Sequence, residues 1–413
     1  MRVLKRGAPP SPDDDRARQA QALTRPRRPL DGPRRRAEAI KASLARRRAA
    51  AVAWRAGLPD VTSPIARTWS RLPQWSRWGV GLGVIVLAVL APADWVGQIM
   101  APASDWKTLL FYPIGIFVLL AVGLNIVVGQ AGILDLGYVA FFAIGGYTMA
   151  LLGVNVGLDF WIILPTAVAL CAVSGLVLGT PALRLRGDYL AIVTLGFGEI
   201  IRISATNASW TGGPRGIAGI PHPPDIGNLD AFTYGVLDPR PYYYLVLGLI
   251  VVVIFVARRL ERSRVGRAWA AIREDEDAAA LMGVPTFRFK LWAFAMGGSI
   301  GGAAGVMFAA KNIAITPDNF PLLLSILVLS AVVLGGSGNL PGVILGAFLV
   351  AWLPERFRGF ADYRVLVFGA ALVIMMIFRP EGLLPSRRRR SSLRTGTSSG
   401  GAPTAVVEQE EKT

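Results

Sequence analysis

Long apolar runs alternate with short polar segments along most of this chain. Several runs reach the roughly 18 to 20 residues that a helix needs to span a bilayer. Their apolar residues are continuous rather than alternating with polar ones, which excludes the strand pattern of a membrane barrel. The pattern predicts an all-α, polytopic transmembrane helix bundle. We expect about ten spans, at residues 79–99, 107–128, 132–153, 160–181, 188–205, 242–258, 289–310, 320–336, 340–355 and 364–379.

Basic residues between the runs predict how the bundle is oriented. Arginines follow the fourth run at 184–186, the sixth at 258–264 and the tenth at 387–390. Because positive charge accumulates on the cytoplasmic side, both termini are expected to be cytoplasmic. Arginines within 356–364 fall on the outer side and conflict mildly with this scheme. The second and third runs, and the eighth and ninth, are joined by very short connections, so re-entrant segments are an alternative to ten full spans.

Charge divides the chain into three expected parts. Residues 1–77 contain 19 Lys or Arg against 6 Asp or Glu, a net +13 of the formal +17. This basic cytoplasmic extension, either mobile or partly an amphipathic helix, fits anionic membrane lipid better than nucleic acid. A transmembrane domain is expected over 78–385, with a cytoplasmic loop at 259–288. Residues 386–413 are expected to form a cytoplasmic tail.

Composition excludes several kinds of chemistry. Cys171 is the only cysteine and His222 the only histidine, so neither an intramolecular disulfide nor a multi-histidine metal site can form. No phosphate-binding loop of the G-x-x-x-x-G-K-[ST] type occurs, so ATP is not expected to bind by that device. We expect no metal, no cofactor and no covalent catalysis. A membrane-embedded enzyme is therefore disfavoured.

A short charged segment at 273–283 interrupts the apolar pattern. Asp275 is a candidate N-cap, and Asp277 lies in the first turn, where the helix dipole favours acidic side chains. Gly283 can adopt the left-handed conformation that ends a helix, and Pro285 prevents continuation. A helix of about two turns is marginal alone in water. The segment therefore predicts a helix that is held by a partner outside the membrane.

Polar residues inside the apolar runs are candidates for a transport pathway. Glu199 lies near the middle of its run, with Arg202 one turn later on the same face. They either serve a pathway or form an ion pair that fixes packing. Asn125, Gln130 and Asp135 flank a glycine-rich break. They either line the inner end of a pathway or satisfy the broken backbone.

Glycine spacing predicts close helix contacts and one irregular segment. Gly297, Gly301 and Gly305 recur at four-residue intervals, which lets helix backbones approach closely in lipid. The cluster at 335–342 is expected to interrupt a helix. The segment at about 206–241 is too long for a simple connector. It either contacts an extracytoplasmic partner or caps the bundle.

Five of these segments together resemble the LivM-type permeases of branched-chain amino acid ABC importers. The resemblance covers about residues 107–385 and excludes both tails. The motifs occur in the family's order, at 123–147, 183–189, 211–213, 266–268 and 335–342.

The resemblance implies a transport subunit and not an enzyme. Its implied partners are two ATP-binding subunits, a second related permease that forms a heterodimer, and an extracytoplasmic solute-binding protein, all at the bacterial cytoplasmic (inner) membrane. Asp277, Ala278, Ala279 and Gly283 match the motif that docks such permeases on the ATPase, although the Ile-x-Leu-Pro ending of its longer form is missing. The implied cargo is Leu, Ile or Val.

Two other transport functions remain as alternatives. The same machinery could carry urea, short amides or other amino acids. A transporter driven by an ion gradient would use Glu199 as the ion or proton carrier.

Overall fold

The computed structural model separates two compact units, Met1–Pro73 and Gln74–Thr413. All residues that it describes belong to the second unit, so the predicted extension 1–77 and tail 386–413 lie outside them. The described residues are 83, 86–100, 105–185, 187–225, 234–235, 238–356, 369–370, 373 and 382–384.

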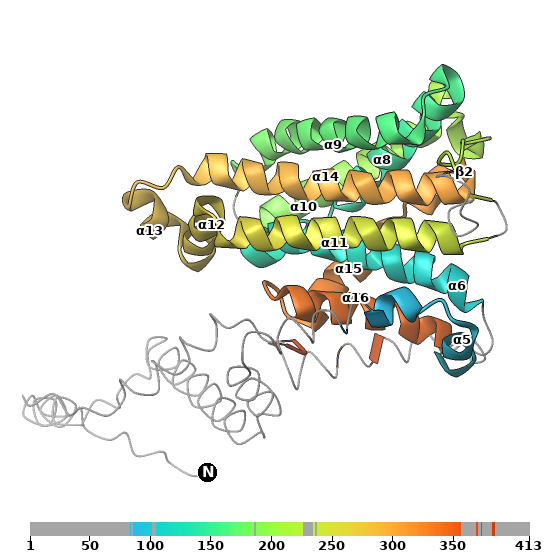
Figure 1. The fold of residues 1–413 in the computed structure, drawn as a ribbon. Helices are drawn as coiled ribbons and strands as arrows, with labels where there is room; N and C mark the ends of the chain where they lie inside the picture. Colours follow the sequence, from blue (N-terminus) through green and yellow to red (C-terminus); the bar gives the residue numbers. More distant parts are fainter. Residues whose placement is uncertain are drawn as a thin grey trace, which may run out of the picture. The chain divides into compact units, whose positions relative to one another are not determined.

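The second unit is a helical bundle, as predicted (Figure 1). Within the described residues, seven helical segments are long and apolar enough to cross a membrane, so the chain is a multi-pass membrane protein. These segments are Trp106–Gln130, Val139–Val156, Phe160–Ala182, Tyr189–Asn207, Arg240–Arg262, Thr286–Asn312 and Pro317–Gly335.

Helix α14 (Thr286–Asn312) occupies the middle of the bundle. It packs against α8 (Val139–Leu151) through one row of glycines and against α9 (Phe160–Ala182) through a neighbouring row. Gly301 and Gly305 approach Phe141, Phe142 and Gly146, whereas Gly302 approaches Cys171. Gly297 in turn lies against Val127 and Tyr138. Because glycine has no side chain, these helix backbones come closer than larger residues allow.

The first described span is one helix built from four pieces. It consists of α6 (Trp106–Leu109), η1 (Leu110–Gly115), α7 (Ile116–Leu124) and η2 (Asn125–Gln130). Pro113 lies inside η1, where it removes a backbone donor and the regular helix is broken. The rest of the span packs against α14, so it shares the core.

Three further helices pack around this core. They are α10 (Asp188–Asn207), α11 (Arg240–Arg262) and α15 (Leu322–Gly335). A tight turn over 336–339 joins α15 to α16 (Leu340–Arg356), as the glycine cluster predicted. Gly335 and Gly342 meet backbone to backbone across this turn.

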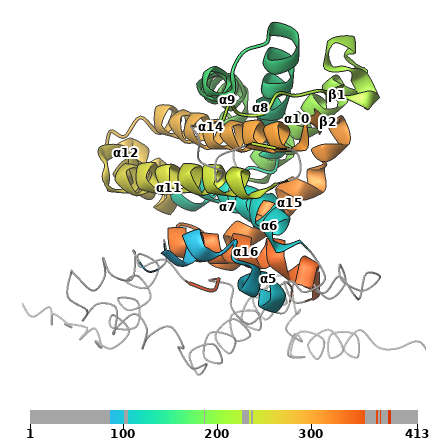
Figure 2. The same cartoon turned by 45° about the vertical axis from the view of Figure 1, so that its right-hand side comes forward.

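The two ends of the bundle carry different structures (Figures 1 and 2). At one end, α12 (Arg264–Glu274) and α13 (Glu276–Leu281) connect α11 to α14. At the other, β1 (Ile217–Ala218) pairs antiparallel with β2 (Ala314–Ile315). Three short 3₁₀ turns accompany this pair, namely η4 (Ser209–Thr211), η5 (Gly213–Arg215) and η7 (Pro317–Asn319).

Two predicted spans differ from the structure. The span expected at 79–99 is interrupted at Ala91–Ala93, where Pro92 breaks the helix before α5 (Asp94–Met100). The span expected at 132–153 begins only at Val139, since residues 131–138 are not helical. Most of the span expected at 364–379 lies outside the described residues.

Candidate functional site

Helix α13 forms as a short capped helix between two spans. Asp275 accepts a hydrogen bond from the backbone N–H of Ala278 through Oδ1, at 2.9 Å, and is therefore the N-cap. Gly283 follows the helix with a φ of +83°, a conformation that glycine adopts without strain. The start and stop signals read from the sequence are those that the structure uses.

The residues of α13 divide into an inward and an outward set. Ala279 is only 5% exposed and faces the protein, whereas Asp277, Ala278 and Gly283 are exposed. Leu281 and Met282 are 89% and 84% exposed. Sequence reasoning missed these two residues, because a Leu-Met pair in a short helix gives no sign of which face it occupies. Two such apolar side chains in water are typical of a surface that a partner covers.

Two contacts attach α12 and α13 to the start of α14. The indole of Trp269 is fully buried and its Nε1 donates to the carbonyl oxygen of Phe289 at 2.6 Å. Lys290 forms an ion pair with Glu276, with 2.5 Å between Nζ and Oε2. Because the two contacts hold different helices, α12 and α13 are both attached to the first turns of α14.

Arg273 joins α12 to two further parts of the bundle. Its guanidinium donates to the carbonyl oxygen of Gly129 at the end of η2, and to Oγ of Ser337 at 3.1 Å in the turn before α16. Asn125 strengthens the same junction, since its Oδ1 accepts from the N–H of Gly338 at 2.8 Å. Arg273 was not among the residues predicted to be functional from the sequence. An arginine two residues before the α13 cap is the signal that could have found it.

The five polar residues proposed for a pathway fall in three separate places. Asn125 is fully buried in the Arg273 junction, and Gln130 ends the same helix with a buried, unpaired Oε1. Glu199 and Arg202 pair with each other on α10, where Nε donates to the two carboxylate oxygens at 3.0 and 3.2 Å. Asp135 lies apart from both sets, in the non-helical segment 131–138.

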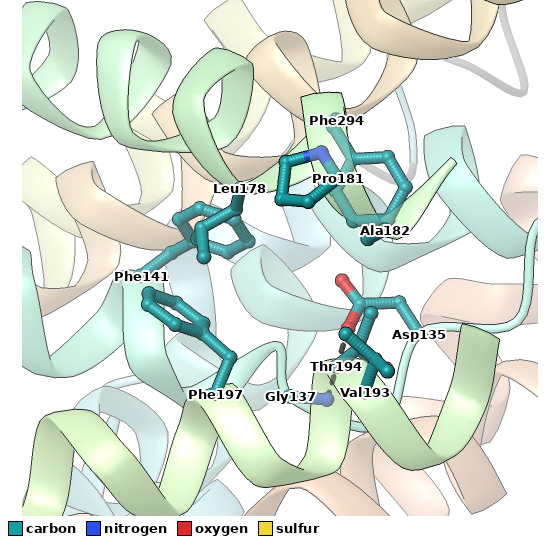
Figure 3. A pocket seen from close by; sticks show the side chains of 10 residues that line it. All are labelled: Asp135, Gly137, Phe141, Leu178, Pro181, Ala182, Val193, Thr194, Phe197 and Phe294. Carbon is teal, nitrogen blue, oxygen red and sulfur yellow. Dashed lines mark hydrogen bonds between the residues drawn. The ribbon is translucent and has the colours of Figure 1, made fainter. Parts of the chain in front are cut away.

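Asp135 lines a cavity between the first part of α10 and the last turns of α9 (Figure 3). Its Oδ1 accepts from the N–H of Gly137 at 2.9 Å, and that turn leads the chain into α8. The N–H of Leu136 donates to Oγ1 of Thr194 at 3.0 Å, which fixes the segment against α10. The other residues lining the cavity are Phe141, Leu178, Pro181, Ala182, Val193, Phe197 and Phe294.

The described residues contain no group of three or more His, Cys, Asp or Glu side chains arranged to hold a metal ion. What the structure does contain is a short helix with two exposed apolar residues, a junction that ties α12 to η2 and to the turn before α16, and a mostly apolar cavity that contains Asp135.

Comparison with known proteins gives the family context. The family described as the permease component of branched-chain amino acid transport systems matches residues 108–377. LivM, the high-affinity branched-chain amino acid transport system permease protein of Escherichia coli K12, is 44% identical over 337 residues, covering 77% of this chain and 78% of LivM. LivM of Salmonella typhimurium has the same identity and coverage. LivH, a second permease protein of that E. coli system, is 23% identical over 288 residues, 65% of this chain and 91% of LivH. No solved structure matches the chain.

Proposed function

We propose that this chain, which belongs to the permease family of branched-chain amino acid transport systems, is a membrane subunit of an ABC importer for leucine, isoleucine and valine. The observation that carries the proposal is the 44% identity to LivM over 337 residues, together with the family match over residues 108–377, which contain most of the described bundle. The chain moves its cargo and catalyses no covalent reaction. ATP hydrolysis belongs to partner subunits.

The proposed assembly has three kinds of partner. A second, related permease pairs with this chain, and LivH is a protein of that type. ATP-binding subunits dock on α13. An extracytoplasmic solute-binding protein delivers the amino acid at the opposite end, where the β1–β2 pair and the exposed Trp210 lie.

Charge supports placing α13 in the cytoplasm of a bacterial inner membrane. Arg258, Arg259, Arg262 and Arg264 follow one another around the end of α11, and all four are exposed beside α12. Such a concentration of arginine next to a span marks the cytoplasmic side. With this orientation α13 faces the compartment that holds ATP.

The contacts of α13 explain how movement outside the membrane reaches the bundle. An ATPase that grips Leu281 and Met282 pulls on a helix that is attached to α14 through Glu276 and Lys290. The Ile-x-Leu-Pro ending is missing, and the contacts of Trp269 and Lys290 attach α12 and α13 to α14. The bundle then alternates between outward and inward access.

The test is reconstitution of the four kinds of subunit in liposomes. The wild-type complex should take up leucine, isoleucine and valine only with ATP, and urea or short amides should not compete. Leu281→Asp and Met282→Asp place charge on the exposed face of α13 and should reduce ATP-driven uptake by about tenfold or more, since a central apolar contact of an interface is lost. Binding of the ATPase and hydrolysis rate are measured alongside uptake.

Leu185→Asp is the matched control. Leu185 is an exposed leucine in the turn between α9 and α10, at the same end of the bundle as α13. It should leave uptake within about twofold of wild type, as expected for a surface position away from the interface. Normal uptake in both α13 variants contradicts the docking role, and uptake without ATP contradicts the importer.

A further inference from the structure

One oxygen of the Asp135 carboxylate is buried without a hydrogen-bond partner. Asp135 is 1% exposed, and only its Oδ1 is occupied by the turn to Gly137. Its Oδ2 is buried without a hydrogen-bond partner, although the Thr194 hydroxyl lies beside the carboxylate, and Figure 3 shows this oxygen directed toward the cavity. Leaving one oxygen of a buried carboxylate unpaired is unfavourable, so Oδ2 would be stabilised by a donor or a cation from outside the fold.

The walls of the cavity do not supply that cation. Among the ten lining residues, Asp135 is the charged side chain, and Thr194 is the one neutral polar side chain. The hydroxyl of Thr194 donates to the carbonyl oxygen of Ala191 at 3.0 Å. The remaining walls are aliphatic or aromatic, including Phe141, Phe197 and Phe294.

The cavity is large enough for a small charged group, and the rest of the ligand can extend out of its open side. The cavity measures about 50 Å³, several times the roughly 10–15 Å³ that one water molecule requires. Pro181 and Val193, on opposite walls, are both exposed and mark its open side. An ammonium group can therefore reach Oδ2 while an attached apolar chain lies along the opening between α9 and α10.

We propose that this cavity binds the ammonium group of the transported amino acid, with Asp135 Oδ2 as its acceptor and the apolar walls contacting the branched side chain. A carboxylate beside aromatic and aliphatic surface is complementary to a primary ammonium on a short apolar skeleton. The inference rests on the proposed function, because that function supplies such a molecule. Asp135 is thus assigned as a substrate-binding residue inside the permease.

The first experiment uses three probes with one branched skeleton. Binding of leucine, 3-methylbutylamine and 4-methylpentanoate to the assembled permease–ATPase complex, without binding protein, is measured by calorimetry in phosphatidylcholine nanodiscs, which contain no primary amine. Leucine and the amine should bind, and 4-methylpentanoate, which lacks the ammonium, should not. Equal binding of the amine and the carboxylate overturns the proposal. Loss of leucine binding when phosphatidylethanolamine is added assigns the site to a lipid headgroup instead.

The second experiment changes the charge and keeps the turn. In Asp135→Asn the amide oxygen still accepts from Gly137, so a purely structural role for Asp135 is preserved. Affinity for leucine and for the amine should fall by about tenfold or more, the value of a charge-assisted hydrogen bond, and the KM for uptake should rise. Asp159→Asn, an exposed aspartate just before α9, is the control and should change neither.

The outcomes separate the two proposals. If Asp135→Asn leaves binding and KM unchanged while wild type transports leucine, the site assignment is wrong and the function stands. If wild type shows no ATP-driven uptake while amine binding still depends on Asp135, the function is wrong and the site stands.

Discussion

Helices α14 and α10 are both apolar spans, yet α14 is largely buried and α10 is largely exposed. In the most apolar stretch of α14, 89% of residues are buried, against 28% for α10. The row of α14 that meets α8 consists of glycines, whereas the free face of α10 carries Ile192, Ile200 and Ile203. In lipid, apolar character does not distinguish a helix surrounded by protein from one at the edge. Small residues at regular spacing do distinguish them, because they mark a helix whose backbone packs closely against its neighbours.

The difference extends to polar groups. Lys290, the buried charged residue of α14, lies in its first turns beside Glu276. Helix α10 carries the Glu199–Arg202 pair near its middle and contributes Val193, Thr194 and Phe197 to the Asp135 cavity. The closely packed helix is therefore suited to hold the bundle together, and the loosely packed one to meet a solute or a second permease.

The largest expected effect comes from filling a glycine of α14. In Gly305→Leu the new Cβ overlaps the carbonyl oxygen of Phe142 and lies 2.6 Å from the amide nitrogen of Gly146. Backbone atoms cannot move aside cheaply, so we expect destabilisation beyond the usual overpacking range of about 1–3 kcal/mol, up to loss of the folded protein. Yield and the midpoint of thermal unfolding in detergent measure it.

Gly196→Leu provides the matched comparison on α10. A Cβ at Gly196 meets no atom within 4 Å. This variant should fold as well as wild type, and the higher helix propensity of leucine should not harm it. Equal loss of stability in the two variants removes the distinction between the helices.

An intermediate effect is expected at the charged pair of α10. Arg202→Ala leaves Glu199 unpaired in the middle of a span, which costs roughly 3 kcal/mol on insertion scales. The double substitution Glu199→Ala with Arg202→Ala removes both charges and should recover most of that loss. Membrane insertion and thermal stability are compared across the single and double variants. A double variant no better than the single one indicates a role beyond mutual pairing.

The smallest effect is expected on the free face of α10. Ile200 is 61% exposed, so Ile200→Ala should change the stability of the isolated chain by less than about 0.5 kcal/mol. The same change in the assembled complex shows whether a partner covers this face. Weaker association of the two permeases in Ile200→Ala, measured by co-purification, places the second permease there. A clear loss of stability in the isolated chain shows that Ile200 packs within it.

Local signals predicted the parts of this fold that depend on short stretches of chain. The cap, the helix stop and the turn depend only on neighbouring backbone, so the sequence predicted them at Asp275, Gly283 and 335–342. The helical bundle followed from apolar run length. The family was also identifiable from motifs that lie in separate helices.

Features that depend on distant segments were not predictable in the same way. Most of segment 131–138 was predicted to begin a span, yet the segment is not helical, and Tyr138 donates to the distant carbonyl oxygen of Gly297 at 2.7 Å. The outward position of Leu281 and the reach of Arg273 to Gly129 likewise depend on how helices pack. For the same reason the sequence could propose Asp135 for a pathway but could not separate it from Asn125.

The Arg273 junction has a mechanical consequence. One planar guanidinium contacts the end of one span at Gly129 and the turn between α15 and α16 at Ser337. A displacement of α12 therefore acts on both of these places at the same time, because one side chain contacts both. In the proposed importer, movement that the ATPase imposes on α12 would therefore reach two sides of the bundle together.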